Sequence, residues 1–164
     1  MEYVFTLKYQ LTDDDDTDAL IERLGAAGCD DALVGIGQRG RLALEFIREA
    51  SCAREAVESA LAAVRQAVPG ARLVEATPDL VGLTDVADIV GVSRQNMRKL
   101  ALTHAFSFPP PVHEGSSSVW HLADILSWMQ SRNAYSFAQE LLELARVTMQ
   151  VNVASAHARV FARV

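Results

Sequence analysis

The sequence of 164 residues predicts an α+β protein built from three parts. Residues 1–79 alternate short strand patterns with helix patterns, which is typical of a mixed domain. Residues 80–132 contain two short helix patterns around a glycine, then a proline-rich loop and a third helix pattern. Residues 133–164 continue as one helix pattern. We therefore expect an α/β domain over 1–79, a second domain over 80–132 and a helical segment over 133–164.

The first element of the chain is predicted to be a half-buried strand. Residues 3–11 alternate apolar and polar side chains, as such a strand does. The acidic run 13–16 lacks the alternating ligands, central glycine and distal glutamate of a calcium loop, so we expect a solvated loop. Asp16 or Thr17 can cap the helix that follows, whose apolar residues are Leu20, Ile21 and Leu24.

A hairpin, a second helix and a last strand complete the first domain. Apolar runs at 31–36 and 41–48 flank a turn at 37–40 with glycine at both ends. Ser51 is expected to cap a helix over 53–68, and residues 71–76 form a strand. The order strand, helix, strand, strand, helix, strand predicts a ferredoxin-like fold, an antiparallel sheet with both helices on one face. The other face of the sheet is either solvated, packed against a second copy of the chain, or used to bind a small ligand.

Residues 83–102 predict two helices joined by a glycine turn. Thr84 is a suitable N-cap for the first helix, and Gly91 can adopt the left-handed conformation that ends it. Ser93 then caps the second helix, whose apolar face consists of Met97, Leu100 and Ala101. This arrangement predicts a helix-turn-helix.

A small β wing and a third helix are expected next. Phe106 and Phe108 are predicted core residues, and the prolines at 109–111 require extended chain. A turn at 114–116 and a strand at 119–121 complete the wing, and a helix over 122–130 turns Ile125, Leu126 and Trp128 inward or toward a neighbour.

The terminal segment 133–164 lacks proline and glycine and carries an apolar stripe along a helix. The apolar face of such a helix must be buried against other residues. We expect a homodimer through this helix, the N-terminal sheet or both, with packing against the rest of the chain as the alternative.

Residues 83–128 resemble the winged helix-turn-helix of the MerR, excisionase and AlpA-like group of small bacterial and phage DNA-binding proteins. The resemblance rests on L-T-D-V-A-D-I-V-G-V-S-R-Q-N-M-R-K-L, then F-P-P-P, then V-W-H-L-A-D-I-L-S-W. It implies double-stranded DNA as partner, with the recognition helix 93–103 in the major groove and the wing 109–121 on the backbone. The first domain lies outside that pattern, and the metal-binding cysteines of the MerR effector segment are absent.

Ten residues are the predicted DNA contacts. The first turn of the recognition helix offers side chains that can pair with base edges, and the next turn can reach bases or phosphates. Small hydroxyl residues at the wing tip allow a close approach to phosphates, and the N-cap serine can add another such contact. The residues are Ser93, Arg94, Gln95, Asn96, Arg98, Lys99, His113, Ser116, Ser117 and Ser118.

The charge of the chain is unevenly distributed. Residues 1–79 hold 8 basic and 15 acidic residues, whereas residues 80–132 hold 4 of each, out of a net charge of −6 for the whole chain. A neutral DNA-binding segment must rely on a few well-placed cations, so we expect weak non-specific binding and a need for dimer avidity.

No motif for catalysis or for a cofactor is present, and the two cysteines have neither disulfide nor metal-ligand spacing. Without a signal peptide or membrane span, we expect a cytoplasmic protein that is not an enzyme and needs neither metal nor cofactor. The leading hypothesis is a sequence-specific regulator of transcription. The alternatives are an excisionase-like architectural factor, an adaptor that uses the acidic first domain, and a small-molecule sensor.

Overall fold

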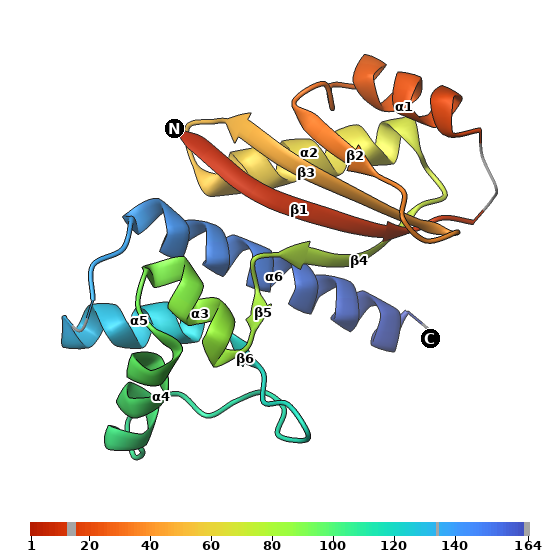
Figure 1. Ribbon diagram of the computed structural model, residues 1–164. Helices are drawn as coiled ribbons and strands as arrows, with labels where there is room; N and C mark the ends of the chain where they lie inside the picture. Colours follow the sequence, from red (N-terminus) through yellow and green to blue (C-terminus); the bar gives the residue numbers. More distant parts are fainter. Residues whose placement is uncertain (13–15, 134, 163–164) are drawn as a thin grey trace. The chain divides into compact units, whose positions relative to one another are not determined.

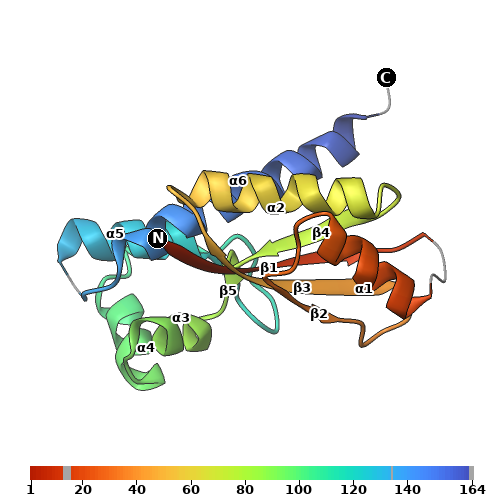
Figure 2. The ribbon, with the colours of Figure 1, turned by 90° about the horizontal axis from the view of Figure 1, so that it is seen from above.

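The computed structural model describes residues 1–12, 16–133 and 135–162, so most of the predicted acidic loop, residues 13–15, lies outside the described residues. The α+β class is confirmed, because the described residues form six helices together with antiparallel strands (Figures 1 and 2). No helix among them is both long and apolar enough to cross a membrane.

The chain separates into two compact units. The sheet unit contains Met1–Thr77 and Gln150–Val164, and the helical unit contains Pro78–Met149. The terminal helix α6 (Gln139–Phe161) therefore contributes its first half to the helical unit and its second half to the sheet unit.

The sheet unit is a four-stranded antiparallel sheet covered by two helices. Its elements are β1 (Glu2–Gln10), α1 (Thr17–Ala26), β2 (Ala32–Gly35), β3 (Arg41–Glu49), α2 (Ala53–Ala67) and β4 (Arg72–Thr77), with the strand order β2-β3-β1-β4. Helices α1 and α2 cover one face of the sheet (Figures 1 and 2). Alternate residues of β1 are buried and therefore face these helices; they are Tyr3, Phe5, Leu7 and Tyr9. On the open face Val4 and Ile47 are paired and half exposed.

The helix starts of the sheet unit differ in part from prediction. Asp16 caps α1 by accepting the Asp18 N–H at 3.2 Å, as expected. The N-cap of α2 is Cys52 rather than Ser51. Ser51 instead donates its backbone N–H and its hydroxyl to the Glu55 carboxylate, and these bonds lower the pKa of that carboxyl. Ile21 is exposed on the outer side of α1.

Arg48 ties the segment before β2 to β3. Its Nε and Nη2 donate to the two carboxylate oxygens of Asp31 at 2.7 and 2.8 Å, and Nη2 also donates to the Gly28 carbonyl at 2.6 Å. The hydrogen bonds from Arg48 hold the pKa of Asp31 below its ordinary value. This pair therefore stabilises the sheet unit while Asp31 is ionised.

Asp31→Asn is expected to lower the free energy of unfolding by about 1 kcal/mol at neutral pH. Because the pKa of Asp31 is lowered on folding, its contribution is present above the ordinary Asp pKa and is lost as pH falls through the lowered value. The gap between wild type and variant should therefore close on acidification. Urea unfolding followed by circular dichroism at a series of pH values measures it, and a gap that stays constant into acid would contradict the assignment.

The second half of α6 is fastened to the edge of the sheet. The Asn152 side-chain amide accepts the Ala76 N–H and donates to the Ala76 carbonyl, both at 2.7 Å. Ala76 lies in β4, which is an edge strand. The side chain of Asn152 thus satisfies the hydrogen bonding of both the N–H and the carbonyl of an edge residue.

The helical unit packs four helices around one apolar core. Its elements are β5 (Leu80–Val81), α3 (Leu83–Val90), α4 (Arg94–Thr103), β6 (Trp120–His121), α5 (Leu122–Arg132) and the first half of α6. Gly91 ends α3 with φ 77°, and Ser93 caps α4 by accepting the Asn96 N–H at 3.1 Å, both as predicted. Met97 is fully buried, which fixes the inward face of α4.

Two predictions for the helical unit were wrong. The N-cap of α3 is Gly82 rather than Thr84, because the extended chain of β5 ends at Gly82 and the Asp85 carboxylate accepts the Gly82 N–H at 2.8 Å. Phe106 is fully exposed, whereas Phe108 is buried. After α4 the Ser107 and Phe108 N–H groups both donate to the His104 carbonyl, and this turn directs one of the two phenylalanines inward.

The buried Asp79 joins the start of the unit to α5. Its Oδ1 lies 2.6 Å from Nδ1 of His121, and its carbonyl accepts the Leu122 N–H at 2.7 Å. Leu141 and Ala145 of the predicted stripe on α6 pack into the core of this same unit, which covers that part of the stripe without a second copy.

Candidate functional site

A cleft of about 580 Å³ lies in the helical unit between α4 and the loop that leads to β6. Three segments line it: residues 82–84 at the start of α3, Arg94 and Arg98 on α4, and residues 115–118 with Trp120. These segments are far apart in sequence. They meet because the two-residue strands β5 and β6 pair with each other next to the start of α3.

The loop side of the cleft is an anchored hairpin, here named the serine hairpin (residues 112–119). The Val112 N–H donates to the Val119 carbonyl at 2.7 Å, and the Val119 N–H donates to the His113 carbonyl at 3.0 Å. The indole Nε1 of Trp120 donates to the Pro109 carbonyl at 2.9 Å and holds the base of the hairpin. Ser116, Ser117 and Ser118 therefore lie on a loop that these hydrogen bonds hold in place. In Figure 1 this loop belongs to the segment between α4 and β6.

The helix side of the cleft follows from the helical period of α4. At about 100° per residue, Gln95, Lys99 and Leu102 lie opposite the buried Met97. Arg94 and Arg98 lie on one flank of that row, one turn apart, and this is the flank that lines the cleft. Asn96 and Thr103 lie on the other flank.

The charge of the cleft is positive although the surrounding sequence is neutral. Helix α4 contains three basic residues and no acidic one. Within the described ranges no hydrogen bond or ion pair engages the guanidinium of Arg94 or Arg98. The first N–H groups of α3 add the positive end of a helix dipole, part of which Asp85 already occupies. Guanidinium, hydroxyl and N–H groups around one hollow are the donor set that binds phosphate oxygens.

Comparison with known proteins identifies no relative of this chain. No family model matches it, and neither a curated protein nor a solved structure matches it. The resemblance to the MerR and excisionase group therefore stays a prediction from the motif.

The cleft brings together half of the ten predicted contact residues. Arg94, Arg98 and the three serines of the hairpin line it. Gln95 and Lys99 are exposed on the outermost row of α4, and Asn96 lies on the flank away from the cleft. The Ser93 hydroxyl serves as the N-cap.

His113 does not line the cleft. Its imidazole lies over Gly115 so closely that a Cβ at that glycine would be 2.8 Å from Nε2 of His113. The predicted wing-tip histidine therefore packs along the hairpin itself.

Sequence reasoning missed residues 82–84 and Trp120 as cleft residues. The ring of Trp120 packs edge-on against Phe108 with centroids 6.2 Å apart, and it also lines the cleft. The sequence feature that could have indicated them is the short apolar run at 80–81, because this run pairs with residues 120–121 beside the cleft.

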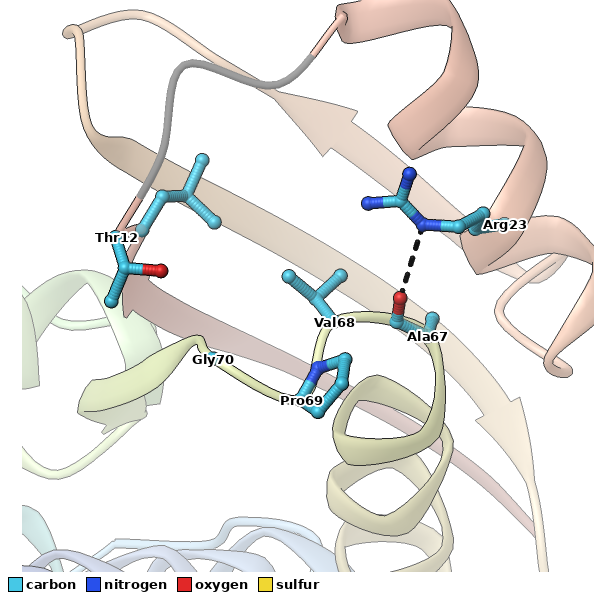
Figure 3. Close-up of a pocket in the computed structure, with 7 residues that line it drawn as sticks. Thr12, Arg23, Ala67, Val68, Pro69 and Gly70 are labelled. Carbon is cyan, nitrogen blue, oxygen red and sulfur yellow. Dashed lines mark hydrogen bonds between the residues drawn. The ribbon is translucent and has the colours of Figure 1, made fainter.

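A second hollow, of about 360 Å³, lies in the sheet unit at the end of α2 (Figure 3). Arg23 reaches across it and donates Nε to the Ala67 carbonyl at 3.2 Å. Ala67 is the last residue of α2, so this cation serves the negative end of a helix. The contact accounts for Arg23, and we assign no ligand to this hollow.

Proposed function

We propose that the protein binds double-stranded DNA as a winged helix-turn-helix and regulates transcription in a bacterium or phage. In this proposal α4 enters the major groove and the serine hairpin is the wing on the backbone. One observation carries it: the cleft gathers two arginines and three serines from separate segments around a helix that has no acidic residue. The strand order β2-β3-β1-β4, with α1 and α2 on one face, supports a ferredoxin-like assignment for the sheet unit.

The proposal includes a homodimer. Residues 80–132 have no net charge, so one copy offers few cations to the phosphate backbone. Two copies on adjacent half-sites raise affinity through effective concentration without new contacts. Apolar side chains left exposed in the sheet unit support such an association; they are Val4 and Ile47 on the open sheet face and Val160 and Phe161 near the end of α6.

Selection from random duplex DNA tests the proposal. The purified chain is expected to enrich one sequence at low salt and to lose affinity steeply as salt rises. Two half-sites separated by a whole number of helical turns are expected, because a two-fold dimer places its α4 helices that far apart. A chain that enriches no sequence at low salt is not a sequence-specific reader, and a single isolated half-site would contradict the dimer.

A further inference from the structure

We infer that α4 divides its work between two faces, with Arg94 and Arg98 holding one backbone phosphate in the cleft and Gln95, Lys99 and Leu102 reading base edges. Leu102 is then the contact for a thymine methyl group. This inference rests on the proposed function. It changes the role expected for Arg94, which the sequence alone had assigned to base readout, and it adds Leu102 to the contacts.

The cleft decides the role of the two arginines. Both side chains line a hollow that is also lined by Ser116, Ser117 and Ser118 of the serine hairpin. No acidic side chain is among the described residues that line this hollow. A phosphodiester seated there receives charge-assisted bonds from two guanidinium groups and further bonds from serine hydroxyls.

The outermost row of α4 is left to face the bases. Gln95, Lys99 and Leu102 lie opposite Met97, which is fully buried, so they project farthest from the core. A glutamine amide pairs with adenine and a lysine ammonium with guanine in the major groove. The side chains of this row therefore match base edges by position and by chemistry.

Leu102 is the unexpected member of this row. It is 72% exposed although it is a large apolar residue in a well-formed helix. The major groove presents one apolar group of its own, the C5 methyl of thymine. Contact between Leu102 and this methyl removes both from water, which is worth about a threefold to fivefold gain in affinity.

The experiment uses the full chain and the duplex that it selects. Arg94→Ala and Arg98→Ala are each expected to weaken binding on all sequences alike and to reduce the salt slope, by about one when both are combined, with base preference unchanged. Leu102→Ala is expected to leave the salt slope unchanged and to relax preference at one thymine. Circular dichroism verifies that each exposed-residue variant is folded.

Deoxyuridine in place of thymine, one position at a time, isolates the methyl group. Wild type is expected to lose about threefold to fivefold in affinity at one position. Leu102→Ala should show no loss there. Thr103→Ala is the matched control on the other flank of α4, and it should keep the wild-type loss.

The possible failures are distinct. A wild-type chain that binds no duplex at low salt overturns the proposed function. A chain that binds selectively, but whose Arg94→Ala or Arg98→Ala variant changes base preference at an unchanged salt slope, overturns the division of roles and leaves DNA binding in place. An equal effect of deoxyuridine on wild type and on Leu102→Ala overturns the methyl contact.

Discussion

The double variant Arg94→Glu, Arg98→Glu is expected to bind duplex DNA at least about 100-fold more weakly than wild type, because a hydrogen bond to a charged group is worth about 1.5–3 kcal/mol and charge reversal adds repulsion from the phosphates. Both side chains are exposed and line the cleft, so the fold should survive the change. Fluorescence anisotropy with a labelled duplex at moderate salt measures the affinity.

The matched control for this variant is Arg54→Glu with Arg65→Glu on α2 of the sheet unit, away from the open sheet face. Both residues are exposed, and the control changes net charge by the same amount outside the cleft. It should retain nearly all of the wild-type affinity, because it leaves the guanidinium and hydroxyl donors of the cleft in place. Equal losses in the two double variants would mean that net charge rather than the cleft governs binding.

Asp79→Ala is expected to lower the free energy of unfolding of the helical unit by about 3 kcal/mol, because it removes a buried carboxylate and leaves its hydrogen-bond partners without an acceptor. The Asp79 residue is 1% exposed, and its carboxylate lies 2.6 Å from Nδ1 of His121. The substitution leaves a cavity and takes from His121 its buried partner. Guanidinium unfolding monitored by circular dichroism measures the loss.

Two controls separate the buried pair from a general effect of lost charge. Asp88→Ala removes an exposed carboxylate from α3 and should change stability by less than about 0.5 kcal/mol. Asp79→Asn keeps volume and a hydrogen-bond acceptor, so its loss should be smaller than that of Asp79→Ala. Equal stability of Asp79→Ala and wild type would show that the pair contributes nothing.

Periodicity predicted most elements of this fold because it reports which face of a segment is apolar. The strands and helices of residues 1–77 and the Ser93 cap of α4 all follow from such local patterns. Errors appeared where two local solutions compete. The helix pattern of α2 does not fix its first residue, and the cap falls at Cys52 instead of Ser51. Phe106 and Phe108 are equivalent in pattern, so a single turn after α4 decides which of them is buried.

The cleft was only half predictable. The arginines and serines stand out in sequence as donors, but their common hollow depends on the pairing of β5 with β6. Two residues per strand are too few to carry a periodic signal. The sequence pattern also does not tell whether the apolar stripe of α6 packs against its own chain or against a partner. Both kinds of packing require the same apolar residues.

The two hydrogen bonds between the Asn152 side chain and the Ala76 backbone have a consequence for solubility. An edge strand is a template to which a strand of another molecule can add, and this is a common route to domain swapping and aggregation. At Ala76 both ladder groups are already bonded to a side chain of α6. The register shift of β4 between its pairings with Lys8 and Tyr9 makes the same edge irregular. A strand from another molecule therefore finds the β4 edge irregular and its backbone groups at Ala76 already bonded, which disfavours strand addition at this edge.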